Sequence, residues 1–149
     1  HLIKMWNEPF YCFLSGGAGV GESHVTKALY QAALKYYNSR AGDNFSELKD
    51  RCWHLLVKQH INVKGNTIHS ALAITACQSL KIFKPLNSSR LNTLRCKLGG
   101  VKFILIDEIS MVDNTMLNVQ FNNRLKDMNG SSVPFGGVSI VAIGDLFQL

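Results

Sequence analysis

A glycine-rich segment, residues 10–23 with the sequence FYCFLSGGAGVGES, constrains the fold of this chain more than any other stretch. An apolar run typical of a β-strand leads into the glycines, and a helical pattern follows from about Glu22 to Asn38. Strand, glycine-rich loop and helix in this order are typical of a phosphate-binding loop, whose backbone N–H groups point at phosphate oxygens. The segment therefore predicts an α/β domain that binds a nucleotide.

The loop departs at one position from the usual phosphate-loop pattern, G-x-x-x-x-G-K-[ST]. Its glycine and hydroxyl positions are filled, but the lysine position holds Glu22. A carboxylate there turns attraction for the phosphates into repulsion, so we expect weak nucleotide binding and almost no hydrolysis. The residues expected to surround the nucleotide are Gly16, Gly17, Ala18, Gly19, Val20, Gly21, Glu22 and Ser23.

Two acidic residues follow a second strand pattern. Residues 101–106 (VKFILI) are nearly all apolar, as expected for a parallel strand buried on both faces, and Asp107 and Glu108 come next. Asp107 is placed to hold Mg²⁺ together with the Ser23 hydroxyl, and Glu108 to activate the attacking water. Acidic residues also follow strands without any such role, but the glycine-rich loop upstream favours the nucleotide site.

A third strand pattern, residues 138–143 (VSIVAI), precedes the hexapeptide GDLFQL. Gln148 in that hexapeptide is expected to contact the γ-phosphate. Helical patterns separate the strands, which favours a mostly parallel sheet flanked by helices in a single domain. The first is expected to bury Val25, Leu29, Ala32 or Ala33, and Tyr36. We expect the second to run from Asn66 to before Pro85, with Ile68, Leu72, Ile74 and Leu80 facing inward. The others are expected from a cap at Ser88–Ser89 through Leu98 and over residues 115–126.

Composition narrows the class of protein. A length of 149 residues suits one domain, and no apolar run is long enough to span a membrane, so we expect no membrane partner. The net charge of +6 fits a polyanionic partner and ordinary basic solubility equally well. Four separated cysteines without a C-x-x-C pair favour reduced thiols in an intracellular protein over a disulfide or zinc site. A start at His1 and an end at Leu149 suggest a fragment.

The segments FLSGGAGVG-x-S, TIHSAL, LIDEISM and GD-x-x-QL, in this order, resemble the petite-integration-frequency (PIF) family of 5′-to-3′ DNA helicases. More narrowly, the chain resembles the helicase part of Helitron-type transposons and their relatives. The resemblance runs over about residues 10–149. The resemblance implies the first RecA-like motor domain of a P-loop NTPase, with ATP and Mg²⁺ as cofactors. It further implies single-stranded or duplex DNA as partner, roles in recombination, repair and telomere maintenance, and a nuclear location with mitochondria as the alternative.

By this resemblance, each site residue acquires a role. Asp107 serves Mg²⁺, Glu108 is the general base and Gln148 senses the γ-phosphate. Thr67 and His69 match a family region near the single-stranded DNA track. For these two residues a helix cap and an ordinary helix-surface histidine are the alternatives.

The chain also lacks a family segment of the form L-A-P-T-G-K-A-A before TIHSAL. Residues 53–60 read WHLLVKQH instead. A coding sequence chosen for the family segment gives these eight residues when it is read one nucleotide later. Our hypothesis is that residues 53–60 are a frame-shifted copy of the family motif, in which Leu55, Leu56 and Val57 can still form a strand.

Three readings of the chain's activity remain open. One is a residual ATPase domain of a helicase whose second motor domain is absent, and another is a catalytically dead, transposon-derived relic that binds nucleotide or DNA weakly. A P-loop kinase or GTPase is the third. The pair Asp107–Glu108, the TIHSAL segment and the lack of a guanine-reading N-K-x-D motif argue against that third reading.

Overall fold

The computed structural model describes residues 8–16, 22–39, 52–56, 66–74 and 81–145. In this part of the chain, five strands form one sheet in the order β1-β5-β4-β2-β3, and every neighbouring pair is parallel. The strands are β1 (Tyr11–Ser15), β2 (Cys52–Leu56), β3 (Asn66–Thr67), β4 (Phe103–Asp107) and β5 (Ser139–Gly144). The predicted parallel α/β sheet is therefore confirmed.

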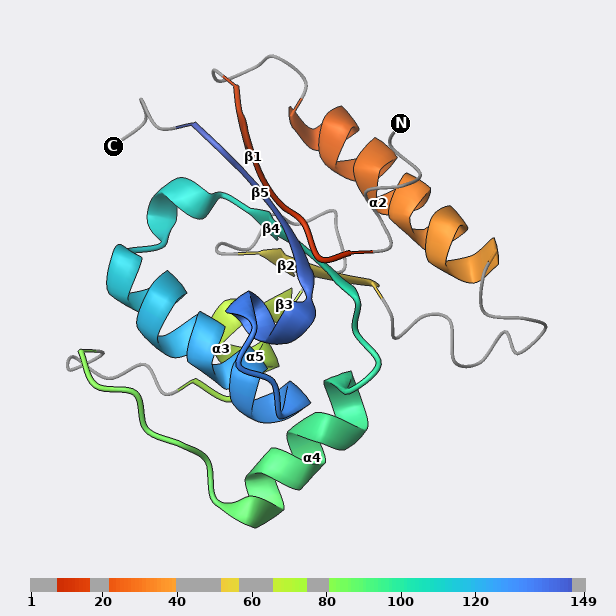
Figure 1. The fold of residues 1–149 in the computed structure, drawn as a ribbon. Helices are drawn as coiled ribbons and strands as arrows, with labels where there is room; N and C mark the ends of the chain where they lie inside the picture. The colour runs from red at the N-terminus through yellow and green to blue at the C-terminus, as the bar shows by residue number, and fades with distance from the viewer. Residues whose placement is uncertain (1–7, 17–21, 40–51, 57–65, 75–80, 146–149) are drawn as a thin grey trace.

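Helices cover both faces of the sheet. Helix α2 (Glu22–Ser39) lies on one face, and α3 (Ile68–Ala71), α4 (Ser88–Leu98) and α5 (Asn122–Asn129) lie on the other (Figure 1). The π-helix η2 (Met116–Phe121) runs directly into α5. A short 3₁₀ helix, η1 (Ile109–Met111), follows β4, and another, η3 (Pro134–Gly137), precedes β5. None of the described helices is long and apolar enough to cross a membrane.

Strand β4 shows why its sequence has no alternation of apolar and polar residues. Phe103 and Leu105 pack into the cluster beneath α2, whereas Ile104 and Ile106 pack into the cluster beneath α3, α4 and α5. Both faces are covered, so both sets of side chains are apolar and less than 3% exposed. The strand is at the centre of the core.

The buried face of α2 differs from the predicted one. Val25 is 45% exposed, which makes its predicted burial wrong, and Leu29 and Tyr36 are only partly buried. The buried residues among the described side chains of this helix are Thr26, Ala33 and Tyr37, of which Ala33 was predicted. Their spacing of seven and four residues follows the helical period as well as the predicted set does, so periodicity alone could not choose between the two faces.

One helix differs from prediction in its range, and another differs in its N-cap. The helix expected from Asn66 to before Pro85 is only the four-residue α3 within the described residues, although Ile68, Leu72 and Ile74 are buried as expected. Helix α4 has the predicted range, but its N-cap is Asn87, whose Oδ1 accepts the Arg90 N–H at 2.9 Å. The predicted cap at Ser88–Ser89 is therefore wrong. Leu80 and residues 75–79 lie outside the described residues.

Residues 81–86, between α3 and α4, are fastened to the outside of η2 and α5 by two buried side chains. Gln120 donates from Nε2 to the carbonyl oxygen of Ile82 at 3.1 Å, and Arg124 donates from Nη2 to that of Lys84 at 3.2 Å. The Arg124 guanidinium also lies 5.0 Å from the centre of the Phe83 ring. Burial lowers the pKa of Arg124, and the charge of nearby Asp127 acts in the opposite direction.

Candidate nucleotide site

The carboxyl ends of the strands bring the predicted site segments to one edge of the sheet. Ser15, the last residue of β1, pairs with Gly144 at the end of β5. Leu56, the last residue of β2, pairs with Asp107 and with Thr67 on its two sides. Ligands of open parallel sheets bind beyond this edge, so the topology gathers these segments where a nucleotide site belongs.

Part of the phosphate-loop segment can be placed. Gly16 directly follows β1, and Glu22 and Ser23 begin α2 (Figure 1). Strand and helix thus flank the glycines in the chain as predicted. Gly17, Ala18, Gly19, Val20 and Gly21 lie outside the described residues, as do the side chains of Glu22 and Ser23.

Asp107 and Glu108 form a tight turn at the end of β4. The Asp107 carboxylate accepts the backbone N–H of Glu108 through Oδ1 at 3.0 Å. Glu108 has a left-handed backbone, with φ 58° and ψ 41°, which is uncommon for a residue other than glycine. Both side chains are half-buried.

The end of β5 packs closely against this turn. A Cβ on Gly144 would lie 3.1 Å from the backbone nitrogen and the Cγ2 of Ile109, and 3.2 Å from the nitrogen of Ser110. Asp145, the next residue, is only 8% exposed and adds a buried carboxyl to the same edge. Gly144 and Asp145 were not predicted to have a role, although both belong to the GD-x-x-QL segment. Gln148 lies outside the described residues.

Thr67 caps the short helix α3. Its Oγ1 accepts the backbone N–H of Ser70 at 3.2 Å and donates to the Ser70 hydroxyl at 2.8 Å. The helix-cap alternative for Thr67 is therefore present in the structure, and it leaves the DNA-contact prediction untested. His69 has an exposed side chain in the same turn. Thr67 ends β3 and His69 follows it, at the same edge of the sheet as Asp107.

The contact between β5 and the η1 turn gives a first testable prediction. Gly144→Ala should lower the free energy of unfolding by about 1–3 kcal/mol, because the new methyl group pushes against the backbone of Ile109 and Ser110. Gly100→Ala is the control, since no atom lies within 4 Å of its Cβ position. Urea unfolding followed by circular dichroism measures both, and equal effects of the two substitutions would contradict the proposed contact.

Comparison with known proteins identifies the arrangement. The sequence model of the PIF1-like helicases matches residues 58–149, which is more than half of the chain. The ATP-dependent DNA helicase Pif1 of Psychrobacter sp. is 32% identical over 137 residues, covering 92% of this chain and 19% of that protein. The chain therefore spans about a fifth of the length of this curated relative.

Solved structures agree. Unliganded Pif1 from Bacteroides sp. superposes with a TM-score of 0.68 at 27% identity, covering 99% of this chain and 30% of the other. Pif1 helicase from Bacteroides in complex with ADP-AlF3 and ssDNA gives a TM-score of 0.57 at 25% identity, again covering 99% and 30%. The RecA-like fold predicted from the motifs is thus confirmed, and the chain belongs to the PIF1-like helicase family.

Proposed function

We propose that this chain is the first motor domain of an ATP-dependent DNA helicase. The observation that carries the proposal is the meeting of three motif segments at one edge of the sheet: Gly16, which opens the glycine-rich loop, after β1, Asp107–Glu108 after β4, and Gly144–Asp145 after β5. The Psychrobacter relative is an ATP-dependent DNA helicase. Residues 1–149 would form this domain, and the remaining length of the relatives would supply the second.

ATP and Mg²⁺ are the proposed cofactors. The relative in complex with ADP-AlF3 supports a nucleotide at this edge. The loop from Gly16 to Ser23 would bind its phosphates, and Asp107 with the Ser23 hydroxyl would hold Mg²⁺. In the described part of the chain, no three His, Cys, Asp or Glu side chains gather into a metal site. A shared site with phosphate oxygens as further ligands is what this chemistry requires. Glu108 would serve as general base and Gln148 as sensor of the γ-phosphate.

DNA is the proposed partner. The Bacteroides relative holds single-stranded DNA, and another solved structure concerns DNA unwinding at forked double-stranded DNA by Pif1 helicases. Thr67 and His69 would lie near the DNA track, at the carboxyl edge of β3. Recombination, repair and telomere maintenance are the cellular roles that the resemblance supports, with the nucleus, or alternatively mitochondria, as the location.

A second reading of the same ancestry is a catalytically dead relic, and Glu22 is the observation that favours it. The lysine of the phosphate loop neutralises charge on the β- and γ-phosphates, whereas a carboxylate repels it. The family match begins at Lys58, inside residues 53–60, so the frame-shift hypothesis and a transposon-derived origin stay proposals. Residues 52–56 nevertheless form β2 between β3 and β4, so the altered segment still supplies a strand.

The experiment that tests the proposal is titration of a fluorescent ADP analogue, with and without Mg²⁺, into the Glu22→Lys chain. We expect Mg²⁺ to strengthen binding, and Asp107→Asn in the same chain to remove most of that gain. Asp113→Asn is the matched control, because Asp113 accepts the Met116 N–H in a helix cap away from the strand ends. Mg²⁺-independent binding, or equal losses in the two variants, would overturn the assignment of Asp107.

A further inference from the structure

The positive charge of this chain is concentrated in one region. Residues 81–102 hold six basic side chains and no acidic one, out of 16 basic residues in the whole sequence. All six are exposed: Lys81, Lys84, Arg90, Arg95, Lys97 and Lys102. Among the described residues, none of them is paired with a carboxylate. The region thus presents uncompensated positive charge to solvent.

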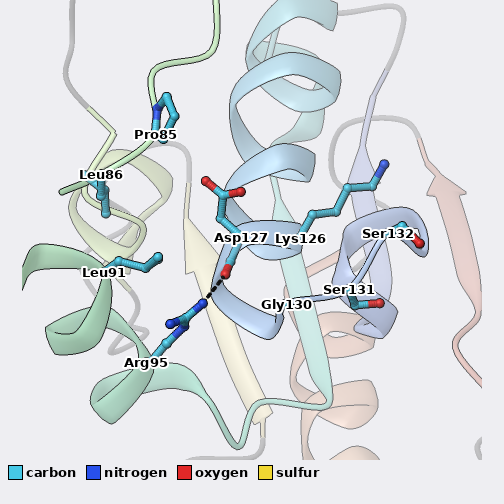
Figure 2. A pocket seen from close by; sticks show the side chains of 9 residues that line it. All are labelled: Pro85, Leu86, Leu91, Arg95, Lys126, Asp127, Gly130, Ser131 and Ser132. Carbon is cyan, nitrogen blue, oxygen red and sulfur yellow. Dashed lines mark hydrogen bonds between the residues drawn. The ribbon is translucent and has the colours of Figure 1, made fainter. Parts of the chain in front are cut away.

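Three basic residues, Arg95, Lys102 and Lys126, line hollows on the side of α4 that faces α5. Arg95 and Lys126 line an open hollow of about 560 Å³ together with the hydroxyls of Ser131 and Ser132 (Figure 2). A second hollow of about 420 Å³ adjoins it and is lined by Arg95 and Lys102. We call these two hollows the Arg95 surface. Asp127 is the acidic residue that lines it.

Arg95 is held in a fixed orientation on this surface. Its Nε donates to the carbonyl oxygen of Met128 at 3.0 Å, and its Nη2 donates to that of Asp127 at 2.9 Å (Figure 2). These bonds satisfy carbonyls at the C-terminal end of α5, which accounts for Arg95 by itself. The guanidinium has five N–H donors, so further donors remain for a ligand, already oriented by the two bonds.

Lys126 and Lys97 lie in the last turns of α5 and α4, where a positive charge also favours the helix C-terminus, but this does not account for the remaining cations. Lys102 follows α4 and precedes β4, and Lys81 and Lys84 belong to the segment fastened over η2 and α5. The larger hollow is also lined by the serines Ser131 and Ser132 and by Leu86 and Leu91. Lysine, arginine and serine donors are what contacts to nucleic-acid phosphates and sugars use.

The Arg95 surface lies at the opposite end of the sheet from the nucleotide site. Lys102 immediately precedes β4, whereas Asp107 ends it, and all neighbouring strands run parallel. Thr67, in the predicted DNA-track segment, is level with Asp107 in the sheet register, through Leu56. A ligand on the Arg95 surface is therefore separate from both.

We propose that the Arg95 surface binds the phosphodiester backbone of DNA as a second contact, away from the strand ends. The choice of DNA rather than another polyanion rests on the proposed function, whereas the contact itself requires no nucleotide. Binding is expected to be independent of sequence, because phosphate contacts carry no base information.

The test is fluorescence anisotropy of a labelled oligothymidylate without ATP, at several salt concentrations between about 50 and 200 mM. The variant is Lys102→Glu/Lys126→Glu, which leaves the Arg95 bonds untouched. Its matched control is Lys27→Glu/Lys35→Glu, an equal change of charge on two exposed residues of α2. A milder variant, Lys102→Gln/Lys126→Gln, guards against loss of folding, which urea unfolding checks for all three.

We expect the first variant to weaken DNA binding by at least about tenfold at low salt. Its slope of log K against log salt should fall by about 1.4, the value for two lost single-strand phosphate contacts. The glutamine variant should lose less affinity in the same direction, and the α2 control should change less than about twofold. Absence of DNA binding, equal losses in the α2 control, or tighter binding of polyglutamate than of DNA would each overturn the proposal. Nucleotide binding, measured separately, would still test the proposed function.

Discussion

Replacing Glu22 by lysine should tighten Mg·ATP binding on the order of 100-fold. At about 4 Å and an effective dielectric constant near 20, one unit charge at the phosphates is worth roughly 4 kcal/mol. The substitution removes one such repulsion and adds one attraction, but solvent and salt screen both. A net gain of about 3 kcal/mol is a conservative value after that discount, and it corresponds to about a 100-fold change in the dissociation constant.

The control for this prediction is Glu22→Gln, which removes the repulsion without adding attraction. Its dissociation constant should fall about midway between those of the native chain and the lysine variant on a logarithmic scale. Titration of a fluorescent ATP analogue with each chain measures this series. If the native chain and both variants bind equally tightly, the side chain at position 22 does not reach the phosphates. Tight binding by the native chain would overturn the inference that Glu22 disables the site.

Hydrolysis should recover much less than binding. In P-loop NTPases an arginine contributed from outside the phosphate loop stabilises the charge of the transition state, and the substitution at position 22 adds no such arginine. Differential stabilisation of the transition state is what raises turnover, whereas a restored lysine in a single domain mainly strengthens binding. Native and Glu22→Lys chains compared in DNA-stimulated phosphate release should therefore differ far less than they do in affinity.

The order of strands and loops was predictable because the strands that carry the site have strong local signals. Residues 101–106 and 138–143 are apolar on both faces, and such short runs bounded by polar residues indicate buried parallel strands. Glycines after β1 and carboxylates after β4 then follow at the strand ends. Strand β2 carries no comparable signal, since its residues, CWHLL, include a histidine and no alternation. Its place depends on pairing with β3 and β4.

The geometry within the site was not predictable, because it depends on contacts between segments far apart in the sequence. Glu108 has a left-handed backbone, but it is neither glycine nor asparagine, the residues whose presence would have indicated that conformation. Gly144 packs against Ile109, 35 residues earlier, and nothing in the local sequence distinguishes this glycine from one in an ordinary turn. The prediction that Val25 is buried was wrong for the same reason. The residues of the sheet beneath α2 decide which of two adjacent faces of the helix is buried.

The largest loss of stability from a single methyl group is expected for Gly136→Ala. Gly136 lies in η3 with φ +62°, and its added Cβ would overlap the carbonyl oxygen of Leu125 and lie 2.8 Å from the carbonyl carbon. The segment cannot easily move away, because Asn129 donates from Nδ2 to the Gly136 carbonyl at 2.9 Å. A shift of Phe135, the residue before Gly136, would also disturb the contact between its ring and that of Phe121.

We expect Gly136→Ala to lower the free energy of unfolding by about 3–4 kcal/mol. About 1–2 kcal/mol comes from a side chain in the left-handed region, and about 1–3 kcal/mol from overpacking against the backbone of α5. Gly130→Ala is the matched control: its φ is +59°, and its Cβ position has no atom within 4 Å, so it should lose only the first part. Urea unfolding of the two variants beside the native chain separates backbone strain from the clash. A loss from Gly130→Ala as large as that from Gly136→Ala would show that η3 yields to the new methyl group and does not press on Leu125.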